Sequence, residues 1–427
     1  MRATQTRSPV AGCGALAEIR PAIRFLRELA GIIIYRTGAL SLYHRLRNRQ
    51  TLTAIVFHRV LRRDDPRWET SLPPWTVADD TFDECLAFFK PHYTIVTLDD
   101  VRASLDGTRP LSPRSLLITF DDGFADNIDY ALPLLQKHCA SATVFITSDV
   151  IGREERLWTE DLLSAFAAGW VGQRELACLH KLLIGGSTCD PEDPTLIWDI
   201  VRHEPDRDEA LVQTAFSKLK IHLRRIKHPR QMLTEDEIGN LVNKGLSIGA
   251  HGKTHTALPF SSNIEAELVW PRTVLNEIVA AHGHGSIDAL SFPHGAYTSE
   301  IVDQALAAGY KLVFTSDAEI CALKNGFLVS PLMGRLDIDG RRIASSGGFR
   351  PELLAISLFT AARRPARTAS RHDLNGEGRP VGPAPPVPVR DDAFIRSRLR
   401  KGWRTMRPRA PQRSEEPSTR SSQWSTG

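Results

Sequence analysis

The chain has 427 residues, of which 42% are apolar and 24% are charged. This ordinary globular composition excludes collagen, a coiled coil and wholesale disorder, and the length allows two to three average domains or one large α/β barrel with additions. Six cysteines without a CxxC pair exclude a cysteine zinc module and favour a reducing compartment.

Charge is distributed unevenly along the chain. Residues 1–50 hold nine arginines against two glutamates, and residues 363–427 hold 14 arginines and one lysine against six acids, which leaves residues 51–362 at −12. Basic arms suit anionic surfaces, so we expect peripheral contact with an anionic membrane and no specific nucleic acid. The alternative is a solvated C-terminal tail without a specific role.

Residues 1–50 are expected to form an Arg-rich helical leader. Its longest apolar run, from Leu29 to Tyr35, has seven residues, whereas a bilayer span needs about 20. The leader shows no convincing secretory cleavage pattern. Its amphipathic character suits either a membrane interface or packing on the body. We therefore expect a cytoplasmic protein that lies peripherally at the inner membrane face.

The first half of the body alternates strands and helices. Residues 115–120 form an unbroken apolar run, as expected for a strand with helices on both faces. Strand, helix, strand at this spacing indicates βαβ units and a parallel sheet. Strands are expected at 52–57, 94–97, 115–120 and 142–147, and helices at 81–89 and 126–137.

The strand pattern stops at about residue 153 and returns near residue 233. We expect a helical insertion at 155–232 between two parts of one domain, 51–154 and 233–345. Thr234 and Glu237 form a capping box that begins a helix. Further strands are expected at 246–249, 289–292, 311–315 and in a last pair near 326–338, with helices at 263–281, kinked or divided at Pro271, and at 299–308. The Pro-, Arg- and Ser-rich residues 363–427 are expected to be a disordered tail.

Two acidic side chains end the apolar strand at 115–120, in the segment Thr119-Phe-Asp-Asp-Gly123. Neighbouring side chains diverge, so one carboxylate can bind a metal while the other faces a water molecule. Parallel α/β folds place their sites at such strand ends. The alternative is an Asx turn or a helix N-cap, since Asp-Asp-Gly is common in turns.

Two histidines four residues apart, His251 and His255, follow the strand predicted at 246–249. With Asp122 they would form a metal site with open coordination positions. Two imidazoles and a carboxylate suit Zn²⁺, and Co²⁺, Ni²⁺ or Fe²⁺ would also bind. The alternative is two ordinary surface or packed histidines.

A third strand end carries Ser291-Phe-Pro-His-Gly-Ala-Tyr297. A Pro-x-Gly turn directs backbone N–H groups to one side, where they can hold a developing oxyanion. Taken alone, the segment is better read as a plain β-turn.

The order and spacing of these three segments resemble the polysaccharide deacetylase family, also called the NodB homology domain or carbohydrate esterase family 4. The resemblance covers roughly residues 50–150 and 232–340. It implies a distorted (β/α)7 barrel and a metal-dependent hydrolase that removes acetyl groups from N-acetylated sugars. Carried over by position, Asp121 resembles the general base, Asp122, His251 and His255 the metal ligands, and the backbone N–H of His294 the oxyanion donor.

Three positions depart from the family pattern. Gly252 replaces the usual Ser or Thr, residues 288–292 lack the Arg that pairs with the base, and residues 332–336 lack the His that protonates the leaving amine. We expect His58 at the first strand end to supply that proton, with His294 as the second choice. Arg335 can act electrostatically but cannot deliver a proton at neutral pH. The predicted substrate contacts are Phe292, Pro293, Tyr297 and Arg335.

The predicted substrate is an N-acetylated polysaccharide or a lipid-linked glycan, with a role in exopolysaccharide biosynthesis. The helical insertion would cover the barrel mouth and select the acceptor. The alternatives are an O-acetyl esterase with the same metal site and a catalytically inactive, carbohydrate-binding barrel.

Overall fold

The computed structural model describes residues 29–154, 157–184, 196–203, 209–219, 230–283, 285–345 and 348–364. Residues 1–28 of the predicted leader and the predicted tail from residue 365 on lie outside the described residues. Within the described ranges, every helix is too short or too polar to cross a lipid bilayer.

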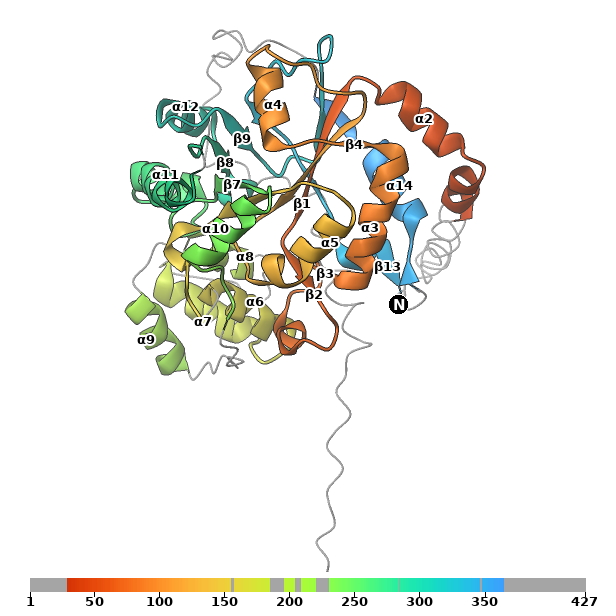
Figure 1. Cartoon of the computed structure of the whole chain (residues 1–427). Helices are drawn as coiled ribbons and strands as arrows, with labels where there is room; N and C mark the ends of the chain where they lie inside the picture. Colours follow the sequence, from red (N-terminus) through yellow and green to blue (C-terminus); the bar gives the residue numbers. More distant parts are fainter. Residues whose placement is uncertain are drawn as a thin grey trace, which may run out of the picture. The chain divides into compact units, whose positions relative to one another are not determined.

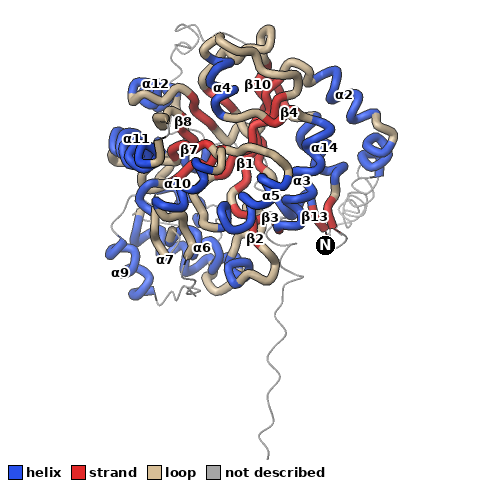
Figure 2. Tube along the Cα trace, in the orientation of Figure 1, coloured by secondary structure: helices blue, strands red, loops and turns tan. Residues whose placement is uncertain are grey.

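A circuit of parallel strands forms the centre of the fold (Figures 1 and 2). The strands in order are β1 (Thr51–Phe57), β5 (Ser115–Phe120), β6 (Thr143–Ile146), β7 (Ser247–Ala250), β8 (Ala289–Ser291) and β9 (Leu312–Phe314). The seventh position is divided between β11 (Leu332–Met333), which pairs with β9, and β12 (Leu336–Asp337), which pairs with β1. The circuit therefore returns to its first strand, and the predicted (β/α)7 barrel is confirmed.

The apolar runs of the sequence become strands that are covered on both sides. Every residue of β1 and β5 is buried, and Ile55 lies opposite Ile118 across the pair. Because successive side chains alternate in direction, the strands supply two apolar layers. One layer contains Ala54, Leu117, Phe145, Leu312 and Phe314; the other packs against the outer helices and contains Ile55, Ile118, Val144, Ile248 and Leu290.

Helices cover the outside of the barrel (Figure 1): α3 (Asp79–His92), α5 (Leu132–Lys137), α10 (Glu235–Asn243), α11 (Ile264–Ala281), α12 (Ser299–Ala307) and α14 (Pro351–Phe359). The capping box before α10 is confirmed, since Glu237 N donates to Thr234 Oγ1 at 3.3 Å and Thr234 N donates to Glu237 Oε2 at 3.0 Å. Helix α11 continues through Pro271, and a π-helical turn at Asn127–Ala131 precedes α5.

Several elements have no counterpart among the predicted ones. They are the parallel pair β2 (Arg59–Leu61) and β3 (Thr76–Ala78), α4 (Leu98–Leu105), α13 (Gly340–Ile343), the hairpin β13 (Ala344–Ser345) and β14 (Gly348–Phe349), and β10 (Glu319–Ala322) with β15 (Ala362–Arg364). The predicted strand at 94–97 is reduced to β4 (Thr94–Ile95). Strand β15 pairs with β10, so the sheet includes Arg363 and Arg364, which the sequence reading had placed in the tail.

The insertion contains α6 (Trp158–Ala167), α7 (Gln173–Leu183), α8 (Leu196–His203) and α9 (Glu209–Leu219). These helices share their own apolar core, against which Leu72 and Trp75 of the loop between β2 and β3 also pack. Figure 1 shows them gathered at the end of the barrel where β2 and β3 lie. The insertion therefore lies at the carboxyl end of the barrel strands.

Candidate active site

The structure brings the three predicted metal ligands together. Asp122 follows β5, and His251 follows β7 four residues before His255. The Nε2 atoms of His251 and His255 lie 3.3 and 3.2 Å from Asp122 Oδ1, and the three ligand atoms all lie within 4.8 Å of one another. Asp122 and His255 reach this arrangement through positive φ angles of 76° and 72°, a conformation that side chains other than Gly adopt mainly at functional sites.

The hydrogen bonding of these side chains fits a divalent cation. A carbonyl oxygen can only accept, so His251 Nδ1 is the protonated nitrogen that donates to Ser291 O at 2.8 Å. The bare Nε2 lone pair then faces Asp122 Oδ1, a buried atom without a hydrogen-bond partner among the described residues. Acceptors that face one another repel unless a cation lies between them. A carbonyl that orients a ligating His is also the usual outer contact of a metal site.

Charge in this cluster is unbalanced towards the acids. Burial would raise the pKa of Asp122, but His255 and His251 hold it well below its ordinary value. Burial would lower the pKa of His251, yet Asp121 and Asp122 raise it above the ordinary value. The site therefore favours positive charge, which either a proton or a metal ion can supply.

Asp121, the predicted base, is held by Arg335. The guanidinium donates from Nη1 to Oδ1 and from Nη2 to Oδ2 of Asp121, each at 2.7 Å. Its remaining N–H groups reach Ser291 Oγ at 2.7 Å, Thr119 Oγ1 at 3.2 Å and Thr315 O at 3.2 Å. Burial would raise the pKa of Asp121, but Arg335 lowers it below the ordinary value, so this carboxylate is ionised at neutral pH.

Arg335 therefore takes the place of the arginine that residues 288–292 lack. It lies between β11 and β12, where the last strand position breaks, and its side chain is 1% exposed. Arg335 lies beside Asp121 and is not among the residues that line the cavity described below, so a substrate contact by Arg335 stays a prediction. The sequence signal was a cation inside an apolar strand segment, which requires a buried anion as its partner.

The loop between the two histidines is fixed by its neighbours. Glu267 of α11, 2% exposed, accepts hydrogen bonds from Lys253 N at 2.7 Å and Thr254 N at 3.1 Å. Gly252 has a φ of 73°, and a Cβ there would lie 2.9 Å from Pro293 Cγ. The Ser or Thr expected at this position would not fit, which explains the departure at Gly252.

The turn after β8 contributes one of its predicted residues to the site. His294 has a φ of 56°, its ring centroid lies 4.5 Å from that of His255, and it lines the cavity. Phe292 and Pro293 are buried, and Tyr297 stacks on Phe292 and donates to Asp317 Oδ2 at 2.7 Å. None of these three is among the residues that line the cavity, and their role as substrate contacts stays a prediction.

A cavity of about 380 Å³ opens above the side chains of Asp122, His251 and His255. Its volume is within the range of small-molecule sites. The barrel contributes Asp121, Asp122, His251, His255, His294 and Asp337 to its lining. The loop between β2 and β3 contributes Leu72 and Trp75, and the insertion contributes Thr159, Glu160, Leu163, Trp198 and Val201. Trp75 and Trp198 meet edge to face with their ring centroids 5.9 Å apart. The insertion thus forms one wall of the cavity.

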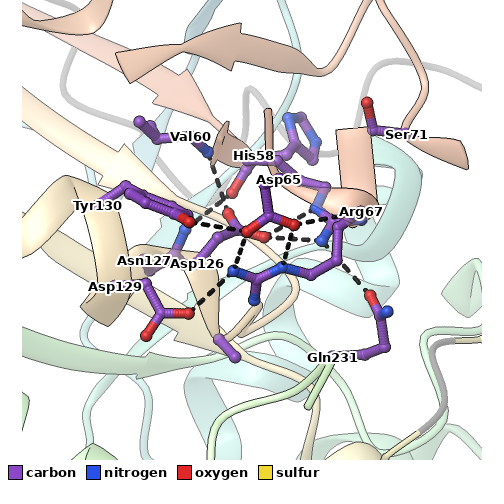
Figure 3. Close-up of polar contacts among 12 residues, drawn as sticks. His58, Val60, Asp65, Arg67, Ser71, Asp126, Asn127, Asp129, Tyr130 and Gln231 are labelled. Atoms are coloured by element: carbon purple, nitrogen blue, oxygen red, sulfur yellow. Dashed lines mark hydrogen bonds and ion pairs between the residues drawn. The ribbon is translucent and has the colours of Figure 1, made fainter. Parts of the chain in front are cut away.

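His58 lines the same cavity at the end of β1. Figure 3 shows the buried polar network around it. Asn127 Nδ2 donates to His58 O at 3.0 Å, and Asp126 accepts from Val60 N at 3.0 Å and from Arg59 Nε at 2.8 Å. The backbone on both sides of Arg59 is therefore held in place. His58 Nδ1 is buried and has no hydrogen-bond partner within the described ranges.

The same network continues through the loop after β2. Arg67 forms ion pairs with Asp65 at 2.8 Å and Asp129 at 3.0 Å, and Tyr130 donates to Asp65 Oδ2 at 2.7 Å (Figure 3). Arg67 lowers the pKa of Asp65, and Asp65 raises the pKa of Arg67, although burial acts in the opposite direction on both. These contacts fix the loop that carries Trp75.

Asp337 is a cavity residue that the sequence reading missed. It ends β12, interacts electrostatically with His58, and has a pKa raised to about 6, chiefly by burial. Its side chain meets solvent within the cavity although protein atoms surround it closely. The available signal was an acid at the end of the last barrel strand.

Comparison with known proteins identifies related sequences and structures. The polysaccharide deacetylase family profile matches residues 108–313. A Bacillus subtilis (strain 168) protein, YxkH, whose name places it provisionally among the polysaccharide deacetylases, is 40% identical over 68 residues, which are 16% of this chain and 24% of that protein. The chain thus matches about a quarter of this relative's length.

Two solved structures are similar to the chain. The deacetylase PplD of Streptococcus pyogenes, in complex with acetate, is 17% identical with a TM-score of 0.45, over 72% of this chain and 98% of that one. IcaB of Ammonifex degensii is 15% identical with a TM-score of 0.44, over 73% of this chain and 98% of that one.

The profile match contains the Asp pair, both ligand histidines and the His294 turn, whereas His58, Arg335 and Asp337 lie outside it. The matched residues are those that the barrel brings to one strand end and arranges around a cation site. Over residues 108–313, the chain is therefore similar to the polysaccharide deacetylase family.

Proposed function

We propose that this protein is a metal-dependent hydrolase that removes acetyl groups from N-acetylated sugars. One observation carries the proposal: the ligand atoms of Asp122, His251 and His255 lie within 4.8 Å of one another, beside a second carboxylate, Asp121, that is held ionised. A cation site with a neighbouring base is the arrangement that amide hydrolysis by water requires.

The donor set suits zinc, with cobalt, nickel or ferrous iron as the other candidates, because two imidazoles and one carboxylate leave coordination positions open. When bound, such an ion supplies Lewis acidity that activates water and polarises a carbonyl at neutral pH. Asp121 accepts a proton from the attacking water. Arg335 orients the carboxylate through both oxygens, so the base is fixed before substrate arrives.

The leaving amine needs a proton when the carbon–nitrogen bond breaks. His58 is the proposed donor, because it lines the cavity together with Asp337 and its backbone carbonyl is held by Asn127. The backbone N–H of His294 is the proposed donor to the oxyanion of the tetrahedral intermediate. The products are acetate and a free amine.

The cavity walls support a sugar substrate. Trp75 and Trp198 present aromatic surface above the polar floor of Asp and His side chains, and the C–H face of a pyranose packs on aromatic rings through apolar contact. The insertion also contributes Thr159 and Glu160 to the lining, and their polar groups can hydrogen-bond to sugar hydroxyls. We propose that the insertion selects an N-acetylated glycan, either polymeric or lipid-linked, and that exopolysaccharide assembly is the setting.

Metal analysis together with acetate release tests the proposal. Asp121→Asn should keep the metal and lose turnover, His251→Ala should lose both, and the control His282→Ala, at the end of α11, should lose neither. Chitooligosaccharide and acetylxylan as parallel substrates separate N- from O-deacetylation. A metal-loaded protein that releases acetate from neither would contradict the enzyme proposal and favour a binding barrel.

A further inference from the structure

An apolar surface with arginine neighbours lies on the N-terminal helices, away from the proposed active site. Eleven large apolar side chains are exposed among the described residues, and six of them fall between residues 29 and 46. The six are Leu29, Ile33, Ile34, Leu42, Tyr43 and Leu46. We call them the N-terminal apolar surface.

The opposite side of these helices is already packed. In α2 (Ala39–Arg47), Leu40 and His44 are buried, and the His44 ring stacks on Phe359 of α14 with centroids 4.0 Å apart. Residues 29–36 are also helical, and Gly31 faces Ile356 of α14 so closely that a Cβ would lie 2.7 Å from its Cδ1. Figures 1 and 2 show α2 as an outer layer over α14. The exposed apolar side chains therefore point away from the barrel.

Charge within the N-terminal segment itself has one sign, and Glu352 of α14 is an acid that acts electrostatically on Tyr35 from outside it. No Asp or Glu occurs from residue 29 to residue 63, and Arg36, Arg45 and Arg49 are exposed beside the apolar side chains. Leu42 and Leu46 are four residues apart, so they share one helix face, and they are 58% and 73% exposed. Apolar side chains bordered by arginines, without acids, are the pattern of helices that lie in the headgroup region of an anionic bilayer.

We propose that the N-terminal apolar surface docks on an anionic lipid bilayer. Leu42, Tyr43, Leu46 and Ile33 enter the boundary between headgroups and acyl chains, and the arginines contact lipid phosphates. Docking of this kind needs no transmembrane helix.

Vesicle sedimentation with the full-length protein tests the proposal. Wild type should bind vesicles of phosphatidylcholine with phosphatidylglycerol at least about tenfold more tightly than vesicles of phosphatidylcholine alone, and about 1 M salt should remove most of this preference. The double substitution Leu42→Glu and Leu46→Glu should weaken binding at least about tenfold. The control Val269→Glu, at a 45% exposed position of α11, should bind as wild type does.

Acetate release from a soluble substrate should be the same in all three proteins, which separates this proposal from the enzymatic one. Binding that the double variant retains would overturn the proposal and place the lipid contact elsewhere, such as the basic tail. A wild type that binds neither vesicle would also overturn it. In that case, a dimeric wild type and a monomeric double variant would show that the surface binds a second copy of the chain. A lower melting temperature of the double variant would show instead that other residues of the same chain cover the surface.

Discussion

Replacing Arg335 by Met tests the pairing that orients the proposed base. The substitution keeps an apolar stem but removes the guanidinium that donates to both oxygens of Asp121 and to Ser291, Thr119 and Thr315. Asp121 is 3% exposed, so water from the cavity can replace these contacts only in small part. Removing one partner of a buried ion pair costs about 3–5 kcal/mol, and we expect a loss of about 4 kcal/mol in the free energy of unfolding at neutral pH.

The pH dependence of this loss has a definite sign. In wild type the pKa of Asp121 is lowered, against the effect of burial, mainly by Arg335. The pair therefore stabilises the fold at neutral pH, and this stability disappears as pH falls through the lowered pKa. Without Arg335, only His251 and His58 act against burial, the largest influence, so we expect the pKa of Asp121 to rise above its ordinary value. The Arg335→Met variant should then lose stability as pH rises through that value and lie closest to wild type in acid.

Urea unfolding at several pH values and the pH profile of acetate release measure both effects. The acidic limb of kcat/KM should move to higher pH in Arg335→Met, while metal content stays at the wild-type level. Arg335→Lys keeps the charge but not the two-point contact, so it should recover part of the stability and part of the limb shift. In a double-mutant cycle with Asp121→Asn, the coupling should exceed about 2 kcal/mol. An unchanged acidic limb together with negligible coupling would refute the reasoning.

Three further substitutions test other parts of the site. The pKa of Asp337 is raised from 3.8 to about 6, chiefly by burial, so the free energy of unfolding falls as pH rises between these two values. Asp337→Asn should therefore raise the free energy of unfolding by about 1 kcal/mol near pH 8, a figure discounted for cavity water, and should change nothing near pH 4. Urea unfolding at the two pH values measures this difference. Trp198→Ala should raise KM for a chitooligosaccharide about tenfold while the metal content stays unchanged. The control Trp170→Ala, outside the cavity, should leave KM unchanged. Equal effects of the two substitutions would contradict a role of Trp198 in substrate contact. Asp126→Ala leaves Arg59 buried and unpaired, so it should cost about 3–5 kcal/mol in urea unfolding, and a loss below about 1 kcal/mol would count against the network.

Much of the barrel was predictable because its signals are local. The unbroken apolar run at 115–120 becomes β5, and the capping box at Thr234 begins α10. Short strands such as β2 and β10 were missed, because two to four residues carry too little periodicity and form through pairing with distant segments. Helix α11 passes through Pro271 although Pro usually kinks or ends a helix, so tertiary packing decided this point.

The sequence by itself predicted the candidate cation ligands and where along the barrel they stand, because Asp122, His251 and His255 follow recognisable strand ends. Only the tertiary structure decided which residue serves Asp121. Arg335 reaches it from the break between β11 and β12, 214 positions away in the chain, and Asp337 meets His58 in the same cavity. Closing the barrel brings its last strand beside its first. Residue patterns along the chain carry no record of such contacts, because they depend on how the strands close in space.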